Sequence, residues 1–594
     1  MIVGIDFGTT NSLVTFIENM DGERAIPLLH EGEPHPSILW LEGQNVVAGK
    51  HAKDLLRSGD VVYSGNIIRS PKLLLGKGNT IRVAGRDRTP AELASELLKF
   101  LRNHATEKMG GRQSFKEAVI TIPVTMQGPG RKALREAARL AGFGIVQFVH
   151  EPLAALYAYF RQNPNREEEI HRLENRVVLV FDWGGGTLDM TLVRVRERNL
   201  CQILNMGLEH VGGDEFDREL MRMLQKRFLE LQGVQDGDIL PTRDKVLLDQ
   251  CEQAKIALST RTEYPVFVSN FARINGKTKD LDMTLTRRDI EEATRGLVDQ
   301  GMTNLRLLLD RSSISPNDVE LCLATGGMAL MPVIYDRLIE IFDGARVPKP
   351  SVVGSATLIS EGAAWIAHDK TRLTLAKPIE LELASGRYLP LLKEGIQLPQ
   401  GEKHVTLGPL TFYCTDPSDG NAKFVLTRPR WPGHITNGAT RDPYMEMLLD
   451  VDPGVPGLFQ RLKLQLHVDQ DLIVAITCEA IGPNYETYSS NTKEIHDLEF
   501  GVMLPSQAVN GDKQVSYRPI TNLPGQTKKT GGIALKSNVS DKERRWADVP
   551  GDVIGRYYPL YFDPRISNPG TYEEELLLRR QLQERDYYRS SNRV

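Results

Sequence analysis

The stretch VVLVFDWGGGTLDM, residues 177–190, decides how the first half of the chain is interpreted. Five apolar residues run into Asp182, and Trp183, three glycines, Thr187 and Asp189 follow. An apolar strand that ends in a glycine-rich tight turn and returns as a second apolar strand predicts a β-hairpin. Glycine leaves backbone N–H groups open to close approach, so the turn predicts a cradle for an anion.

The N-terminus repeats this plan in IVGIDFGTTNSLV, where an apolar strand ends at Asp6. Two copies about 175 residues apart are far more specific than a single glycine-rich hairpin. An acid beside a phosphate cradle repels phosphate unless a cation lies between them, and Mg²⁺ prefers carboxylate, phosphate and water oxygens. Asp6 and Asp182 therefore predict a phosphate–Mg²⁺ clamp between two related lobes, with the metal held largely through water. The predicted cradle residues are Gly8, Thr9, Thr10, Gly184, Gly185 and Gly186.

A third glycine turn lies in ELCLATGGMALMPVI, residues 320–334. Gly326 and Gly327 follow an apolar strand and precede a helix-like segment. Glycines at this place let a flat ring or a phosphate approach the start of a helix. A plain strand–helix turn is an equally good interpretation of these residues alone, so both stay open at this point.

Length and composition exclude several classes of protein. The 594 residues predict about three or four domains, and the 41% hydrophobic and 25% charged content is ordinary for a globular protein. The net charge of −4 argues against a nucleic-acid binder. Five scattered cysteines form no CxxC pair, which predicts buried, reduced thiols and a cytoplasmic location. No apolar run reaches the ~18 residues of a membrane span.

The order of these motifs resembles that of the actin-fold ATPases, and within them the 70-kilodalton heat-shock chaperones of the DnaK type. The resemblance implies a divergent bacterial-type member whose α/β actin-like ATPase domain has two duplicated lobes. It also implies ATP or ADP with Mg²⁺ as cofactors, and K⁺ as a further candidate ion. Across residues 1–367 the matching motifs are GIDFGTTNS, HEPLAALYAY, FDWGGGTLDM, HVGGDEFDREL, CEQAKIALST and LATGGMALMPVI.

The resemblance also implies a set of catalytic residues. Lys72, in RSPKLLLG, matches the family's catalytic lysine, whose ammonium would neutralise charge that develops on the γ-phosphoryl group. Glu151 would help to hold the waters of Mg²⁺, and Asp189 would orient water or metal. Thr187 would donate a hydrogen bond to the γ-phosphate. With the two aspartates that end the apolar strands, these residues form the predicted catalytic set.

Further residues match the family's nucleotide contacts. Gly212 and Gly213 form its double-glycine turn before a helix. Glu252, Lys255 and Ser259 share one helical face at i, i+3 and i+7 and match its adenosine-binding helix. Without the resemblance, an ordinary solvated face would be the better interpretation of this spacing.

Three other positions bear on how nucleotide is handled. Pro123 and Arg131 stand eight residues apart, as in the family, where such a pair relays the nucleotide state to the domain surface. Pro123 could otherwise simply end a strand. Trp183 replaces the family's small aliphatic residue, and it is either a neutral packing substitution, which we favour, or a sign of altered nucleotide handling.

The second half of the chain changes character at Pro378, where short alternating runs separated by glycine turns predict strands and hairpins. They resemble the family's peptide-binding β-sandwich. The tail has too few apolar residues for a full helical lid, but Thr571 and Glu574 form a capping-box pattern that predicts one helix. The predicted division is an ATPase domain over residues 1–367, an interdomain linker over 368–377, a β-sandwich domain over 378–505 and a divergent tail over 506–594.

The leading functional prediction is a DnaK-like chaperone that couples slow ATP hydrolysis to the binding of unfolded peptide or of a dedicated client protein. A J-domain protein and a nucleotide exchange factor are candidate partners, and neither a nucleic acid nor a membrane span is expected. The alternative is a slow nucleotide switch or scaffold in a dedicated assembly. A filament protein or sugar kinase of the actin fold is disfavoured, because a sugar kinase has no use for the appended β-sandwich.

Overall fold

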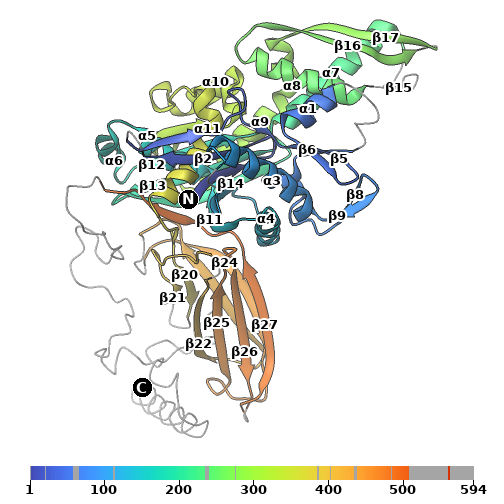
Figure 1. Ribbon diagram of the computed structural model, residues 1–594. Helices are drawn as coiled ribbons and strands as arrows, with labels where there is room; N and C mark the ends of the chain where they lie inside the picture. Colours follow the sequence, from blue (N-terminus) through green and yellow to red (C-terminus); the bar gives the residue numbers. More distant parts are fainter. Residues whose placement is uncertain are drawn as a thin grey trace. The chain divides into compact units, whose positions relative to one another are not determined.

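The structure is a computed structural model, and the chain divides into two units (Figure 1). The first unit comprises Met1–Leu373 and Val502–Gln507, and the second comprises Thr374–Gly501 and Ala508–Val594. The described residues are 2–19, 22–57, 66–111, 114–234, 240–241, 243–274, 276–383, 387–401, 403–433, 438–482, 485–506 and 560–561.

The first sheet of the first unit contains the N-terminal hairpin. Strand β1 (Ile2–Phe7) pairs antiparallel with β2 (Asn11–Glu18) across the first glycine turn. On its other side β1 pairs in parallel with β10 (Glu117–Ile122), which in turn pairs in parallel with β11 (Gly144–His150). The strand order is β11-β10-β1-β2-β3, with β3 (Arg24–Pro27) at the edge. The Asp6 turn therefore lies at the end of a central strand.

The second sheet repeats the plan of the first. Strand β12 (Val177–Trp183) pairs antiparallel with β13 (Thr187–Arg196) and in parallel with β18 (Val319–Thr325). Strand β14 (Asn199–Glu209) extends the sheet beyond β13. Every residue of β12 is buried, as its continuous apolar run predicts for a central parallel strand. The repeated plan fits the predicted α/β domain with two duplicated lobes.

Helices α5 (Glu151–Gln162) and α11 (Val352–His368) pack against each other, and α11 also packs on β1. This approach is so close that only glycine fits at two positions. A Cβ on Gly362 would lie 1.8 Å from the carbonyl oxygen of Ala154, and one on Gly4 would lie 2.1 Å from a backbone nitrogen of α11. Backbone-to-backbone packing of this kind fixes the start of α5, and with it Glu151, relative to the first sheet.

Other helices of the first unit surround the two sheets (Figure 1). Helices α3 and α9 each begin with a capping box, in which the cap side chain and the third helical residue exchange hydrogen bonds. Within the described ranges, every helix is too short or too polar to span a bilayer. The helices of the first unit other than α5 and α11 are α1 (Lys50–Arg57), α3 (Pro90–Lys108), α4 (Gly128–Leu140), α6 (Arg166–Leu173), α7 (Gly213–Gln232), α8 (Asp244–Leu258), α9 (Arg287–Ser312) and α10 (Pro332–Phe342).

The first unit also contains short strands and 3₁₀ turns. Strands β5, β6 and β7 form one small sheet, β8 and β9 form a hairpin, and β16 and β17 form a long hairpin with β15 at its edge. The strands are β4 (His35–Pro36), β5 (Ile38–Glu42), β6 (Asn45–Ala48), β7 (Ile67–Arg69), β8 (Ile81–Val83), β9 (Arg86–Arg88), β15 (Leu240–Pro241), β16 (Glu263–Ile274) and β17 (Lys277–Thr286). The 3₁₀ turns are η1 (Pro71–Leu74), η2 (Pro316–Asp318), η3 (Gly327–Leu330) and η4 (Gly344–Arg346).

Trp183 is a packing residue in this fold. Its side chain is fully buried, and its indole Nε1 donates a 2.9 Å hydrogen bond to the carbonyl of Val211. The ring makes edge contacts with Phe181 and Phe216, at centroid distances of 5.8 and 5.9 Å. Helix α9 makes room for it with Gly301, where a Cβ would lie 2.6 Å from the indole. The buried ring with a satisfied N–H is the arrangement expected of a neutral packing substitution.

Three histidines cluster where β4 meets α3. Nε2 of His35 lies 3.1 Å from Nδ1 of His104, and the His35 ring makes an edge contact with Phe100 at 5.2 Å. The ring of His30 lies about 6 Å from both other imidazoles. Burial, helped by His104 and His30, lowers the pKa of His35 to about 4. The pKa of His104 is also lowered, mainly by burial and by Lys108.

This cluster makes stability depend on pH. Below the unfolded pKa of ~6.5 the unfolded chain binds a proton that His35 in the folded chain does not, so stability falls as pH drops from 6.5 towards 4. The cost reaches roughly 2 kcal/mol at pH 5. We expect His35→Gln to be less stable than the wild type at pH 7.5, as measured by urea unfolding. Between pH 7.5 and pH 5.0, however, the variant should lose much less stability than the wild type does. The exposed His51→Gln should keep the wild-type pH dependence, and an unchanged slope in His35→Gln would contradict the assignment.

The second unit is built from two antiparallel sheets (Figure 1). One has the order β21-β20-β23-β24 and the other β27-β26-β25-β22-β29. Burial alternates along β25 and β26 of one sheet and along β23 of the other, so each sheet has one buried face, and the unit fits the predicted β-sandwich. The strands of the two sheets are β20 (Ile379–Glu382), β21 (Tyr388–Leu392), β22 (Val405–Cys414), β23 (Asn421–Pro429), β24 (Arg441–Asp450), β25 (Arg461–Val468), β26 (Val474–Ile481), β27 (Thr487–Ile495) and β29 (Leu560–Tyr561). Two further strands, β19 (Thr374–Leu375) and β28 (Phe500–Met503), pair antiparallel with each other outside these sheets.

Side chains of β27 close one edge of this sandwich. Ser489, Asn491 and Lys493 donate hydrogen bonds to successive outward carbonyls of β24. All five cysteines of the chain lie in the described ranges, are buried and form no disulfide bond, which confirms the predicted buried thiols. The helix predicted near Thr571 lies outside the described residues.

Candidate active site

A cavity of 180 Å³ in the first unit lies between the two repeated glycine turns. It collects residues from both sheets, from the η1 turn and from the start of α5. The residues predicted for catalysis or phosphate binding that line it are Asp6, Gly8, Thr9, Thr10, Lys72, Glu151, Asp182, Gly184, Gly185, Gly186, Thr187, Gly326 and Gly327. Sequence reasoning did not name Pro34, Ser355 or Ile359, which line it too.

The two glycine turns face each other in direct contact. A Cβ on Gly185 would lie 1.6 Å from Oγ1 of Thr10, and one on Gly186 would lie 2.6 Å from Cγ2 of Thr9. Glycine is therefore required there by the opposing turn as well as by any ligand. Oγ1 of Thr10 is buried and has no hydrogen-bond partner among the described residues. A buried hydroxyl without a partner is costly, so a ligand oxygen fits at this place.

Lys72 and Glu151 form a buried ion pair at the cavity. The η1 turn carries Lys72 and follows Ser70, whose backbone is left-handed with φ of 52°. Nζ of Lys72 lies 2.5 Å from Oε1 of Glu151, and both side chains are more than nine-tenths buried. Glu151 is the first residue of α5, where Pro152 is compatible with the first helical turn. The helix start therefore places this carboxylate beside the ammonium.

The aspartates are held by hydrogen bonds that the sequence did not reveal. Oγ1 of Thr121 on β10 donates to Asp6 at 3.2 Å. Oγ1 of Thr187 donates to one carboxylate oxygen of Asp189 at 2.8 Å, and the backbone N–H of Val124 donates to the other at 3.0 Å. Asp189 is thus fixed in place from the first sheet although it belongs to the second.

Burial shifts the titration of these acids upwards. It raises the pKa of Asp6 and of Asp189 to about 7, with the charge of Glu151 adding to the effect. The pKa of Asp182 is also raised well above its usual range, by burial first and then by the charges of Glu151 and Asp189. Burial alone would lower the pKa of Lys72, but Glu151 and Asp6 raise it.

Three buried carboxyl groups and a single lysine line this cavity, and Asp189 is buried next to it without lining it, so the cluster is short of positive charge. A divalent cation would supply that charge and let the acids ionise. In the described ranges there is no group of three or more Asp, Glu, His or Cys side chains that could hold a metal ion without other ligands. A cation held partly by water and by phosphate oxygens fits this donor set.

The predicted glycine pairs pack onto the second turn. The backbone N–H of Gly213 donates to the carbonyl of Gly184 at 3.1 Å, and a Cβ on Gly212 would lie 2.4 Å from the carbonyl oxygen of Gly185. Gly326 has a φ of 81°, and a Cβ there would lie 2.4 Å from the carbonyl oxygen of Trp183. These positions need glycine so that separate segments can converge behind the cavity.

The predicted adenosine residues on α8 are already engaged with other protein groups. Nζ of Lys255 lies 2.8 Å from Asp217 and donates to the carbonyl of Gly213 at 3.0 Å. Oγ of Ser259 donates to the carbonyl of Lys255 at 3.2 Å. Glu252 pairs with Lys53 at 2.7 Å. None of the three α8 residues is among those that line the 180 Å³ cavity, and their contacts with a nucleoside stay a prediction.

Two ion pairs connect α1 with α8. Lys53 pairs with Glu252, and Nε of Arg57 lies 3.0 Å from Oδ2 of Asp249. Sequence reasoning missed Lys53, Arg57 and Asp249. A signal was present, because two cations at i, i+4 on one predicted helix match two acids at i, i+3 on another. We call these two ion pairs the α1–α8 latch.

Pro123 and Arg131 lie on a turn that contacts the acid cluster. The carbonyl of Pro123 accepts a hydrogen bond from the N–H of Met126 at 3.1 Å, and Arg131 donates to the carbonyl of Met126 at 2.5 Å. Val124 in the same turn donates to Asp189. The structure therefore places the pair one hydrogen bond from a candidate catalytic acid, while the relay itself stays a prediction.

Comparison with known proteins agrees with this geometry. A model of the Hsp70 protein family matches residues 2–371. The chain is 28% identical over 506 residues to the chaperone protein DnaK of Thermosipho melanesiensis, covering 82% of this chain and 79% of that protein. It is 28% identical over 509 residues to the chaperone protein DnaK of Thermotoga maritima, with the same coverage. The family match spans more than half of the chain and includes both glycine turns, so the chain belongs to the Hsp70 protein family.

Proposed function

We propose that this Hsp70-family protein is a chaperone that binds and hydrolyses ATP with Mg²⁺ at the candidate active site. The observation that carries the proposal is the pair of facing glycine turns, with the unpartnered Thr10 hydroxyl beside a buried cluster of acids and Lys72. Bare N–H groups and a hydroxyl suit phosphate oxygens, while acids and a lysine suit a metal-bound triphosphate. The DnaK chaperones that the chain resembles support the same function.

Each residue of the cluster has a task in this proposal. Mg²⁺ bound with the nucleotide supplies positive charge to the phosphates. The N–H groups of both glycine turns bind phosphate oxygens from two sides and so align the γ-phosphoryl group. Lys72, held by Glu151, stabilises negative charge that develops on that group. Asp189 orients the attacking water, and its pKa of about 7 suits it to accept a proton.

The second unit is the proposed client-binding module. Its two antiparallel sheets match the predicted peptide-binding β-sandwich, and curated relatives of similar length are chaperones. Unfolded peptide or a dedicated client protein is therefore the proposed cargo. A J-domain protein and an exchange factor are proposed partners, and the cytoplasm is the proposed location.

The test of this function is steady-state ATP hydrolysis by the full chain. We expect slow turnover that needs Mg²⁺, stops with EDTA and rises when an unfolded probe, such as reduced carboxymethylated lactalbumin, and a J-domain protein are added. Absence of Mg²⁺-dependent turnover would contradict the proposal. Turnover that neither the unfolded probe nor the J-domain protein changes would instead support a nucleotide switch without chaperone activity.

The α1–α8 latch makes a separate prediction about nucleotide release. Lys53 and Glu252 are both largely buried, so their pairing holds α1 and α8 together more strongly than an exposed ion pair would. We expect Lys53→Ala combined with Arg57→Ala to speed the release of a fluorescent ADP analogue about 10-fold, which corresponds to ~1.4 kcal/mol. Lys50→Ala is the control, because Lys50 on the same helix pairs with exposed Glu31. Unchanged release in the double variant would show that the latch does not retain nucleotide.

A further inference from the structure

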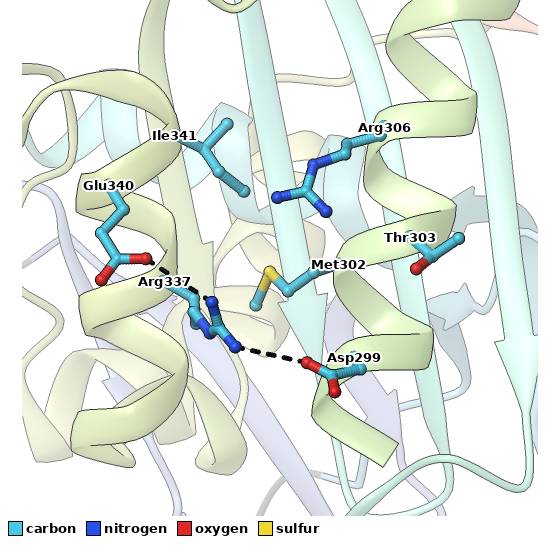
Figure 2. Close-up of a pocket in the computed structure, with 7 residues that line it drawn as sticks. All are labelled: Asp299, Met302, Thr303, Arg306, Arg337, Glu340 and Ile341. Carbon is cyan, nitrogen blue, oxygen red and sulfur yellow. Dashed lines mark hydrogen bonds and ion pairs between the residues drawn. The ribbon is translucent and has the colours of Figure 1, made fainter. Parts of the chain in front are cut away.

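A surface groove lies between α9 and α10, and Figure 2 shows the residues that line one end of it. The groove shares no lining residue with the active-site cavity. It consists of two adjoining hollows of 330 and 700 Å³. Arg306 and Ile341 line both hollows, so the two are continuous. We call the two hollows together the α9–α10 groove.

The charges of the groove leave one cation available. Arg337 on α10 is neutralised by Asp299 at 3.3 Å and by Glu340 at 3.7 Å (Figure 2). Arg306 is exposed and makes no hydrogen bond or ion pair with any residue in the described part of the chain. Asp310, one turn further on, also lines the second hollow but is not within ion-pair distance of Arg306. A guanidinium in this position can bind a carboxylate bidentately.

The second hollow offers an apolar surface beside this cation. Leu309, Ile314, Pro316 and Ile341 line it. Along α9 the groove residues recur at i, i+3, i+7 and i+11 from Asp299, so they occupy one face of the helix. That face is about 17 Å long, which matches about five residues of extended chain. Acidic side chains line both hollows, since Asp299 and Glu340 line the first and Asp310 lines the second.

We propose that the α9–α10 groove binds a partner protein through a short segment in which an acidic residue adjoins a large apolar one. The carboxylate of the segment pairs with Arg306, and the apolar side chain enters the hollow lined by Leu309, Ile314 and Ile341. Asp299, Glu340 and Asp310 repel a second carboxylate, so the segment carries its acid only at Arg306. This contact is independent of nucleotide chemistry, since no groove residue belongs to the candidate active site.

The test selects ligands from a displayed library of random 12-residue peptides. The full chain is the target, and the Arg306→Glu chain is used first to remove peptides that bind elsewhere, including those that bind the second unit. We expect enriched peptides to share an acidic residue next to Leu, Ile, Phe or Met. Binding of the enriched peptides, synthesised with a fluorescent label, should weaken at least 10-fold in Arg306→Glu, and replacing their acidic residue with lysine should restore binding to that variant.

A control on the same helix separates this contact from general charge effects. Arg311→Glu also removes an exposed arginine of α9, but Arg311 does not line the groove. It should bind the enriched peptides as the wild type does. Arg306→Glu should keep the wild-type melting temperature and the wild-type ATP turnover. The peptide measurement therefore tests the groove, and the turnover measurement tests the proposed function independently of it. The proposal is overturned if no shared pattern emerges, if the pattern lacks an acid, or if Arg311→Glu is as weak as Arg306→Glu.

Discussion

Replacement of Lys72 with alanine is expected to lower the rate of ATP hydrolysis by at least ~100-fold, the usual cost of removing one group that stabilises charge in a transition state. Lys72 is more than nine-tenths buried and supplies the single ammonium among the residues that line the described cavity. Its loss also leaves Glu151 without its ion-pair partner. Single-turnover hydrolysis measures the chemical step free of product release.

Two controls decide what a slow Lys72→Ala chain means. Lys77→Ala changes an exposed lysine just beyond the same turn and should hydrolyse ATP at the wild-type rate. Asp189→Asn keeps Lys72 and its ion pair, so it should fold and bind nucleotide while losing turnover, because an amide cannot accept the proton from water. If Lys72→Ala stays within twofold of the wild type, Lys72 has no part in the chemistry.

The repeated glycine turns could be predicted from sequence because their requirements are local. An apolar run, an acid and a glycine turn predict a hairpin from the local sequence, and the second copy makes the anion cradle a specific prediction. The structure places the two turns in contact, with Gly185 against Thr10. The repetition indicated two lobes, but only the fold shows that Gly185 and Gly186 are also required by the opposing turn, at Thr10 and Thr9.

The partners of these residues could not be predicted, because each comes from a distant part of the chain. Val124 binds Asp189 across 65 positions, and Lys53 binds Glu252 across 199. The sequence of the helical face that carries Glu252 and Lys255 does not show whether these side chains bind a nucleoside or pair with other side chains of the protein. Burial and proximity arise only in the folded chain, and so do the raised pKa values of Asp6 and Asp189.

Trp183 shows how a departure from a family pattern can be explained by one compensating residue. An indole needs more room than a small aliphatic side chain, and α9 provides it at Gly301. Glycine within a helix costs about 1 kcal/mol relative to alanine, so its presence there needs a reason. Contact with the buried ring is that reason, and neither Trp183 nor Gly301 lines the active-site cavity.

Replacement of Gly301 with valine should therefore destabilise the first unit by about 3 kcal/mol, because even a Cβ would lie 2.6 Å from the indole and a packed core cannot absorb added volume. Thermal and urea unfolding measure the loss. The matched control is Gly296→Val on the same helix, because a Cβ there meets nothing within 4 Å and only helix propensity changes.

Combining Gly301→Val with Trp183→Leu tests the explanation directly. Trp183→Leu alone should cost several kcal/mol, since it leaves a cavity and removes the donor to the Val211 carbonyl. The added valine should fill part of that cavity, so the double variant should be more stable than the sum of the two losses by ~1–3 kcal/mol. Additive losses would mean that the side chains at positions 183 and 301 do not compete for the same volume. Gly301 would then be required for a reason other than contact with Trp183. ATP turnover per folded molecule should stay close to wild type in the double variant, because neither side chain lines the cavity.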